Sequence, residues 1–302
     1  MLNSRNYILV TPTKNEEENL PKLISSVLKQ NIIPCIWVIV DDGSTDKSSQ
    51  IIKNAVHDYD WIKYEQVSLK ERNLERVSYV CKVGFDSAIK LTGDKIAYEY
   101  LGILDADMAL DKNYFEDLIS KFEQDPRLGI ISGSTWSYNK GEYIREIENE
   151  SSPNGAARLW RNDCFIKCYD GTNGFSMPYA TDTVSVVKAK MAGWKTRRFE
   201  AFKTYQARPT SGAEGLWNGY KKNGQINYYF NYNPFVVLLK GLILCLKRPY
   251  YVGLAYLLGY FEGVVCRMEQ INDEDTRYYF MYTNLIELVK RHSKNIGKRF
   301  FI

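Results

Sequence analysis

Residues 101–107 read Leu-Gly-Ile-Leu-Asp-Ala-Asp, an apolar run that ends in two carboxylates, Asp105 and Asp107. The carboxyl end of a strand is where an open α/β sheet binds its ligands. Carboxylates two positions apart on an extended segment project to the same side, so they can share a divalent cation or its water shell. A solvated acidic turn would give the same pattern, and these seven residues alone leave both interpretations open.

The first 130 residues alternate apolar runs with amphipathic segments, as successive βαβ units do. The pattern predicts strands at Tyr7–Thr11, Ile36–Val40, Ile62–Val67 and Tyr100–Leu104, and helices at Glu17–Gln30, Lys47–His57 and Val77–Thr92. Strands this apolar indicate a mostly parallel sheet that is covered on both faces. Right-handed connections then bring the polar loops 11–16, 41–46 and 105–107 to one edge of the sheet.

The pattern changes after residue 130, where we expect a strand at Ile130–Trp136, a mixed segment with a helix over Arg145–Lys167, and a turn at 171–174. A helix is expected over Thr181–Gly193, with Asp182 in its first turn. Beyond about residue 212 the composition shifts towards Tyr, Asn and Gly. We therefore expect two domains, residues 1–212 and a helical, aromatic-rich extension over 213–302.

Composition and charge limit the function classes. The 302 residues are 25% charged and carry a formal net charge of +4, which is too small to indicate a nucleic-acid partner. Cys164 and Cys168 are four apart, but neither of the two histidines is near them, which argues against a zinc site. The cysteines lie mostly in apolar stretches, and the amino terminus resembles a first strand more than a signal peptide. These features favour a reducing, cytoplasmic compartment.

Three loops in order, Thr-Pro-Thr-Lys-Asn-Glu (11–16), Val-Asp-Asp-Gly-Ser-Thr-Asp (40–46) and Leu-Asp-Ala-Asp (104–107), resemble the family 2 glycosyltransferases over roughly the first 200 residues. The resemblance implies the GT-A fold: a mostly parallel α/β sheet with flanking helices, divided into a Rossmann-like nucleotide-binding half and an acceptor half. It also implies an inverting enzyme. Such an enzyme moves a sugar from a nucleotide-diphosphate donor of the UDP or GDP type to an acceptor hydroxyl.

The same resemblance implies roles for the loop residues. The donor nucleotide would be bound by Thr11, Thr13, Asn15, Glu16, Asp41, Asp42, Gly43 and Asp105. A divalent cation, Mn²⁺ or Mg²⁺, would be held by Asp107 and would neutralise the charge that accumulates on the leaving diphosphate. For Asp42 and Asp46, a turn or helix-capping role is the competing interpretation.

Basic residues are candidates for the phosphates. Arg72, Arg76 and Lys82 lie between the third strand and the Asp-x-Asp pair, where a solvated helix face is the alternative. Arg208 has a guanidinium fork suited to a diphosphate.

Asp182 is at the place where the family carries its catalytic base, which removes the acceptor proton. Thr181 replaces the acid that often precedes it, and helix capping is the alternative role for Asp182. Gln206 stands where many relatives have a metal-binding histidine, and its neutral amide is a weaker ligand. The chain lacks the Gln-x-x-Arg-Trp string of processive synthases, which favours a single transfer.

The segments Phe235–Leu246 and Tyr250–Cys266 are apolar but shorter than the roughly twenty residues needed to span a bilayer. They are interpreted as a core-capping hairpin, a pair lying on a membrane surface, or a dimerisation patch. The acceptor is expected to be a glycan, a polysaccharide precursor or a lipid-linked saccharide. Two other functions stay open: a nucleotide-sugar-binding protein with impaired catalysis, and a sugar-phosphate nucleotidylyltransferase, although Thr11–Glu16 lacks the glycines usual in the latter.

Overall fold

The computed structural model describes residues 5–67, 76–139, 141–146, 150–169, 181–208 and 215–286. The chain divides into two compact units, Met1–Pro209 and Thr210–Ile302. The expected domain boundary, between residues 212 and 213, lies outside the described residues, as does the expected turn at 171–174.

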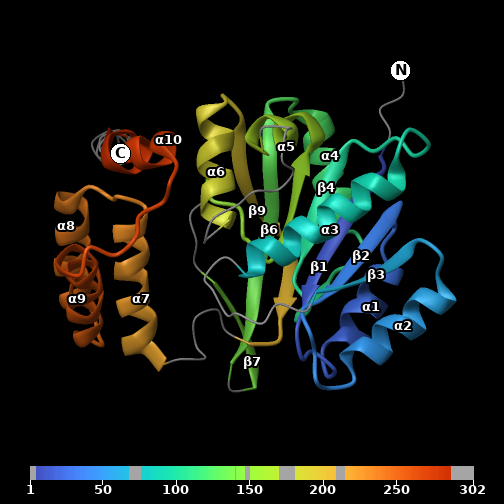
Figure 1. The fold of residues 1–302 in the computed structure, drawn as a ribbon, viewed down its shortest axis with the longest axis horizontal. Coiled ribbons are helices and arrows are strands. Elements are labelled where there is room, and N and C mark those ends of the chain that lie inside the picture. Colours follow the sequence, from blue (N-terminus) through green and yellow to red (C-terminus); the bar gives the residue numbers. More distant parts are fainter. Residues whose placement is uncertain are drawn as a thin grey trace, which may run out of the picture. The chain divides into compact units, whose positions relative to one another are not determined.

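The described residues of the first unit form a nine-stranded sheet in the order β3-β2-β1-β4-β8-β6-β9-β5, with β7 paired to β6 (Figure 1). The strands are β1 Tyr7–Thr13, β2 Ile36–Asp41, β3 Ile62–Gln66, β4 Tyr100–Leu104, β5 Met108–Leu110, β6 Leu128–Asn139, β7 Glu142–Arg145, β8 Ala157–Arg161 and β9 Lys195–Gln206. The first four are mutually parallel, as predicted. The other half is mixed, since β8 runs antiparallel to both β4 and β6 while β9 is parallel to β6.

Helices cover both faces of the sheet. They are α1 Leu20–Leu28, α2 Ser48–Asp58, α3 Arg76–Thr92, α4 Tyr114–Gln124, α5 Asn162–Tyr169 and α6 Thr181–Met191. Alternate residues of a strand point to opposite faces, so Tyr7 and Leu9 of β1 join a core with α1, α2 and α4. Val10 points the other way, towards α3, which lies across β1 and β2 (Figure 1).

Two segments differ from the expected elements. The first helix begins at Leu20 and not at Glu17, because Asn19 is its N-cap and Pro21 lies in its first turn. The mixed segment Arg145–Lys167 does contain a helix, the first part of α5, but strand β8, which directly precedes that helix, was not predicted. Because β8 is buried on both faces, it lacks the apolar–polar alternation by which a half-buried strand is recognised. Its boundary with the helix that follows is therefore not visible in the sequence.

A distant pairing shapes the edge of the sheet near the Asp-x-Asp pair. The short strand β5 follows Asp107 directly and pairs antiparallel with the end of β9, with Met108 opposite Gln206. The backbone N–H of Ala207 donates to the carbonyl of Asp107 at 3.0 Å. The end of β9 is thereby fixed beside the carboxylates that follow β4.

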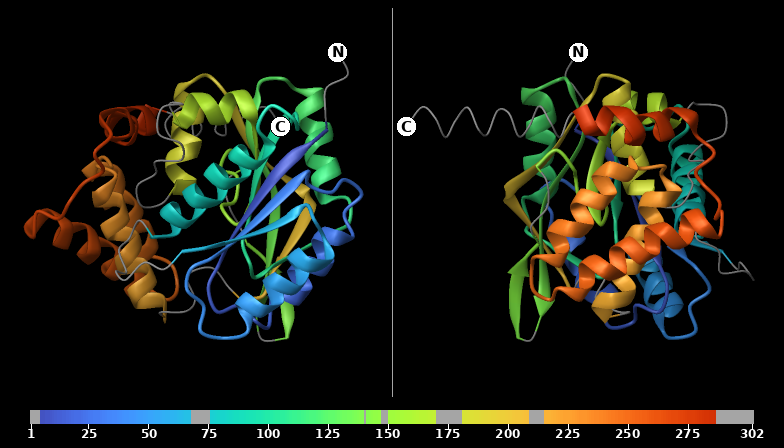
Figure 2. Two further views of the ribbon diagram at one scale, coloured as in Figure 1. Left: turned by 45° about the vertical axis from the view of Figure 1, so that its right-hand side comes forward. Right: turned by 90° about the vertical axis from the view of Figure 1, so that its left-hand side faces the viewer.

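The second unit is helical, with α7 Gly215–Tyr229, α8 Pro234–Cys245, α9 Tyr251–Val265, α10 Glu274–Tyr278 and a π-helical turn at Tyr279–Thr283, drawn in orange to red in Figure 2. Its small core is formed by Val237, Tyr256 and Tyr260. Among the described residues, no helix has both the length and the apolar character to cross a membrane.

Helices α7 and α9 pack with their backbones in direct contact at glycines. A Cβ atom added at Gly259 would lie 1.9 Å from the carbonyl oxygen of Lys221, and one added at Gly224 would lie 2.0 Å from that of Tyr256. Backbone atoms cannot move aside as a flexible side chain can. The two helices therefore approach this closely only because both positions are glycine.

We expect Gly259→Ala to destabilise the second unit by about 3 kcal/mol, at the upper end of overpacking effects, because it must push the two helices apart. Urea unfolding of the full chain, followed by circular dichroism, measures the change. Leu258→Ala, at an exposed position of the same helix, is the control and should cost less. Equal unfolding midpoints for the two variants would contradict the close packing.

Candidate active site

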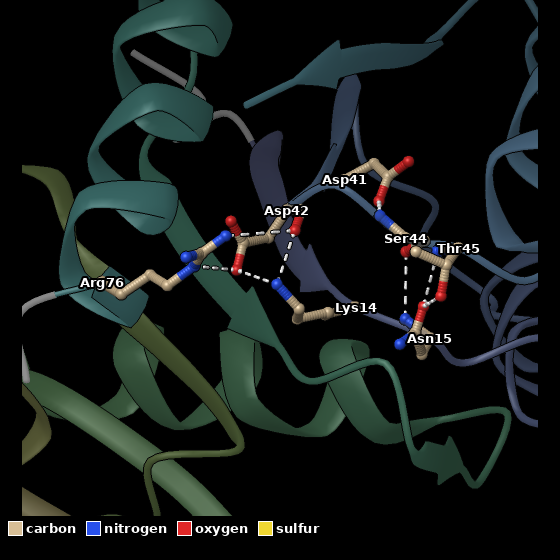
Figure 3. Close-up of polar contacts among 7 residues, drawn as sticks. All are labelled: Lys14, Asn15, Asp41, Asp42, Ser44, Thr45 and Arg76. Atoms are coloured by element: carbon tan, nitrogen blue, oxygen red, sulfur yellow. Dashed lines mark hydrogen bonds and ion pairs between the residues drawn. The ribbon is translucent and has the colours of Figure 1, made fainter. Parts of the chain in front are cut away.

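The loops after β1 and β2 are joined by hydrogen bonds (Figure 3). Asn15 adopts a positive φ of 54°, its N–H donates to Ser44 Oγ at 3.0 Å, and its side-chain oxygen accepts from the N–H of Thr45 at 2.8 Å. Further along, the N–H of Glu16 donates to Ser48 Oγ at 2.8 Å. These hydrogen bonds fix the loop after β1 against the loop after β2 and the start of α2.

Asp42, which directly follows β2, pairs with two cations. Arg76 Nε donates to Asp42 Oδ2 at 2.5 Å, and Lys14 Nζ lies 3.4 Å from the same oxygen (Figure 3). The other carboxylate oxygen, Oδ1, is buried and has no hydrogen-bond partner within the described part of the chain, and the same is true of Thr13 Oγ1. Burying such groups without a partner is costly, so a polar ligand that pairs with them would stabilise the site.

A cavity of about 500 Å³ opens at the carboxyl ends of β1, β2 and β4. It lies within the first unit and is large enough for a nucleotide. Its described lining comprises Pro12, Thr13, Lys14, Glu16, Asp42, Arg76, Val77, Val80, Asp105, Ala106, Asp107, Gln206 and Arg208. The structure thus brings together six of the residues predicted for donor or metal, namely Thr13, Glu16, Asp42, Asp105, Asp107 and Gln206, together with Arg208.

Four residues predicted to bind the nucleotide are not in this lining. Thr11 is fully buried and accepts a hydrogen bond from Trp37 Nε1 at 3.0 Å. Asp41 is also fully buried, with its Oδ1 accepting from the N–H of Ser44 at 2.8 Å, so its carboxylate forms a turn. Asn15 joins the two loops, and Gly43 supplies the positive φ of 67° that the second loop requires.

Lys82 also lies outside the cavity lining. Its ammonium pairs with Asp86, one turn further along α3, at 2.5 Å, as expected for a solvated helix face. Arg76 is the first residue of the same helix, more than one turn before Lys82, and it does line the cavity. Arg72 lies outside the described residues.

Arg208 links the two acidic parts of the cavity. Its Nε donates to Asp107 Oδ2 at 3.1 Å, and its other end pairs with Glu16. Burial lowers the pKa of Arg208, but the carboxylates of Glu16 and Asp107 outweigh this effect and raise it overall. Gln206 Nε2 lies 3.4 Å from the same Asp107 oxygen. A positive charge is thus already favoured beside Asp107.

Asp105 faces a different environment. Burial raises the pKa of Asp105 to about 7, and the nearby charge of Asp107 adds to the rise, while Arg158 opposes it. The backbone N–H of Asp105 donates to the carbonyl of Ala156 at 2.7 Å, which fixes the start of the turn. Asp105 therefore favours the protonated form near neutral pH more than an exposed aspartate does.

The raised pKa of Asp105 predicts how the stability of the metal-free protein depends on pH. The unfolded Asp105 carboxyl ionises near its reference pKa of about 4, whereas the folded one keeps its proton up to about 7. The protein should therefore lose stability relative to Asp105→Asn as pH rises from about 4 to 7, by on the order of 2–4 kcal/mol, with no further change above. Chemical denaturation in a chelator at pH 4.5, 6 and 8 measures it, and a constant difference between the two proteins would refute the raised pKa.

Asp182 lies in the first turn of α6, with half of its side chain exposed. Its backbone carbonyl accepts from Arg158 Nη1 at 3.1 Å, and its carboxylate lies 4.0 Å from Nη2 of the same guanidinium. The charges of Arg158 and Asp182 both act on the pKa of Asp105, so the three groups are neighbours. Asp182 is not part of the described cavity lining.

Sequence reasoning missed Arg158, the side chain that connects these groups. It is 1% exposed and also donates to Ser185 Oγ at 3.0 Å, so it fixes the start of α6 relative to β8. The available signal was a charged residue inside the apolar run Ala157–Trp160, because arginine is seldom buried without a specific role.

The residues fit a divalent cation only together with a ligand. No cluster of three or more His, Cys, Asp or Glu side chains suited to a metal occurs among the residues for which the structure gives positions. Asp107 offers one carboxylate and Gln206 one amide, and Mg²⁺ or Mn²⁺ commonly takes its other oxygens from water and substrate phosphates. A cation that arrives with a diphosphate is therefore compatible with this cavity.

A parallel α/β half-sheet with an acidic, partly unpaired cavity at its strand ends is typical of nucleotide-binding enzymes. Comparison with known proteins is more specific, since the family model described as glycosyl transferase family 2 matches residues 8–191. That is more than half of the chain, and the protein belongs to this family of glycosyltransferases.

The individual relatives that match share low sequence identity with this chain. The chain is 28% identical over 134 residues to the poly-beta-1,6-N-acetyl-D-glucosamine synthase of Staphylococcus epidermidis, and 27% identical over the same length to that of Staphylococcus aureus. Each match covers 44% of this chain, and the chain spans only 29% of the length of these relatives.

Solved structures agree on the fold. The mannosyltransferase PcManGT from Pyrobaculum calidifontis, solved with GDP-Man and Mn²⁺, aligns with a TM-score of 0.53 at 14% identity, over 87% of this chain and 88% of its own. S. aureus TarS aligns with a TM-score of 0.50 at 16% identity, over 74% of this chain and 39% of its own. The predicted GT-A fold is thereby confirmed.

Proposed function

We propose that this protein is an inverting glycosyltransferase that moves a sugar from a nucleotide-diphosphate donor to a hydroxyl of a saccharide or lipid-linked acceptor in a single transfer. The observation that carries the proposal is the cavity at the ends of β1, β2 and β4 in a chain of family 2. Two of its lining residues carry buried oxygens with no partner among the described residues, Thr13 Oγ1 and Asp42 Oδ1. Hydroxyl and carboxylate groups are the partners that a base N–H or ribose hydroxyl requires.

The remaining roles are part of the same proposal. Asp105 would border the nucleotide, and Asp107 with Gln206 would hold a divalent cation. When bound, that cation would stabilise negative charge on the leaving diphosphate. Arg208 would turn from Asp107 towards the phosphates, for which its fork is suited. Asp182 would accept the proton of the acceptor hydroxyl.

The proposed donor site can be tested by thermal shift with UDP, GDP, dTDP and CDP, each with and without Mn²⁺. We expect one of them to raise the melting temperature of the full chain more strongly when Mn²⁺ is present, because a ligand that binds only the folded state stabilises it. Asp42→Ala should remove the shift, whereas Asp94→Ala, at an exposed site outside the cavity lining, should keep it. A shift in neither condition, or one unaffected by Asp42→Ala, would refute the proposed site.

A further inference from the structure

Helix α8 has an unusual distribution of side chains. Its exposed positions form an apolar stripe at helical spacing, which we call the α8 face: Phe235, Leu238, Leu239, Leu242, Ile243 and Leu246. Phe235 is 68% exposed and Leu246 is 81% exposed. The opposite side of the helix is buried at Val237 and Gly241, against α9. A surface helix normally presents charges to water, so this helix is apolar on the side that should be polar.

The charged residues within α8, the turn and most of α9 have one sign. Residues 234–261, which include α8, the turn and most of α9, contain Lys240, Lys247 and Arg248 but no Asp or Glu. All three residues are exposed, although the ammonium of Lys240 also lies over the ring of Tyr256, 5.0 Å from its centroid. A second copy packed on this face about a two-fold axis would bring two such basic segments together, which is unfavourable. An anionic surface is the complementary partner.

The dimensions and the aromatic residues favour a bilayer surface. At 1.5 Å per residue, the 12-residue α8 is about 18 Å long, too short for a hydrocarbon core of about 30 Å. Lys247 and Arg248 lie in the turn between α8 and α9, and the exposed Tyr250 and Tyr251 follow them at the start of α9. Amphipathic rings of this kind favour the headgroup region. A short helix with an apolar face, flanking cations and interfacial aromatics is suited to lie in the plane of the membrane.

We infer that the α8 face, with Lys240, Lys247 and Arg248, binds the surface of membranes that contain anionic lipids. The apolar side chains enter the boundary between headgroups and acyl chains, and the cations contact lipid phosphates. The inference is independent of the proposed transfer reaction, because it concerns the second unit alone and needs no nucleotide.

Co-sedimentation of the full chain with vesicles tests it, using phosphatidylcholine alone and phosphatidylcholine with 25% phosphatidylglycerol. We expect binding to the anionic vesicles that weakens as salt is raised, and little binding to the neutral ones. Leu242→Asp should lower the partition coefficient at least tenfold. Lys240→Gln with Lys247→Gln should lower it about fivefold for each cation removed. Both changes are at exposed positions, and an unchanged circular dichroism spectrum verifies folding.

Ile33→Asp, an exposed apolar residue of the first unit, is the matched control and should bind as the parent does. Equal binding of the parent and Leu242→Asp to anionic vesicles would overturn the inference, as would absence of binding to both vesicle types. A concentration-dependent dimer that Leu242→Asp dissociates, without vesicle binding, would assign the face to a second copy of the chain instead.

Discussion

Asp182→Asn is expected to lower the turnover number for sugar transfer by about 10²–10⁴-fold while leaving the KM for the donor nearly unchanged. The amide keeps the size of the side chain but cannot accept the proton of the acceptor hydroxyl. Asp182 is outside the described cavity lining, so its loss should not weaken donor binding. Release of the nucleoside diphosphate from the donor chosen by thermal shift measures the effect.

The competing role for Asp182 is capping of α6, which would affect stability more than rate. A charge in the first turn contributes only about 0.3–1 kcal/mol. Asp163→Asn is a matched control, since Asp163 occupies the first turn of α5 and is exposed. We expect Asp163→Asn to retain full activity. A modest fall in melting temperature with normal turnover in Asp182→Asn would show that Asp182 is a cap and not a base.

Asp107→Ala is expected to lower activity at least 100-fold and to abolish any dependence of nucleotide binding on Mn²⁺. Asp107 Oδ2 lies 3.4 Å from Gln206 Nε2 in the cavity lining, and the substitution would take from the proposed cation its carboxylate ligand. The substitution also leaves Arg208 with Glu16 as its remaining carboxylate partner. Nucleotide binding without metal should therefore be retained or strengthened, because the guanidinium is freer to meet phosphates.

Titration with Mn²⁺ at fixed nucleotide distinguishes this from general damage to the site. The parent should show a saturable rise in affinity, and Asp107→Ala a flat response. Asp94→Ala provides the control for loss of a carboxylate elsewhere. A metal response that survives Asp107→Ala would mean that the cation is held by other groups.

Local patterns were sufficient to predict the parallel half of the sheet. Strands β1, β2 and β4 are buried on both faces, and amphipathic helices separate the strands of this half, so each βαβ unit follows from a short stretch of sequence. The mixed half was not predictable in the same way. The pairing of Met108 with Gln206 joins residues far apart in sequence, and no local pattern specifies it.

The candidate site was predicted to the level of the loop, but not always to the residue. Neighbouring residues at a strand end point to opposite sides, so Asp41 turns towards Tyr64, whose hydroxyl donates to it at 3.2 Å, while Asp42 faces Arg76 and the cavity. The sequence Asp-Asp alone does not predict which of the two carboxylates faces the cavity. Thr11 and Thr13 differ for another reason: Trp37 engages the hydroxyl of Thr11 and leaves that of Thr13 for a ligand.

Isothermal titration of the full chain with UDP and with GDP, in Mn²⁺ and in chelator, measures whether the cavity at the ends of β1, β2 and β4 binds a nucleoside diphosphate. We expect one of them to bind with one-to-one stoichiometry, more tightly in Mn²⁺, and Asp42→Ala to weaken this binding at least tenfold. Absence of binding by both nucleotides in both conditions, or equal affinity in the parent and Asp42→Ala, would contradict it.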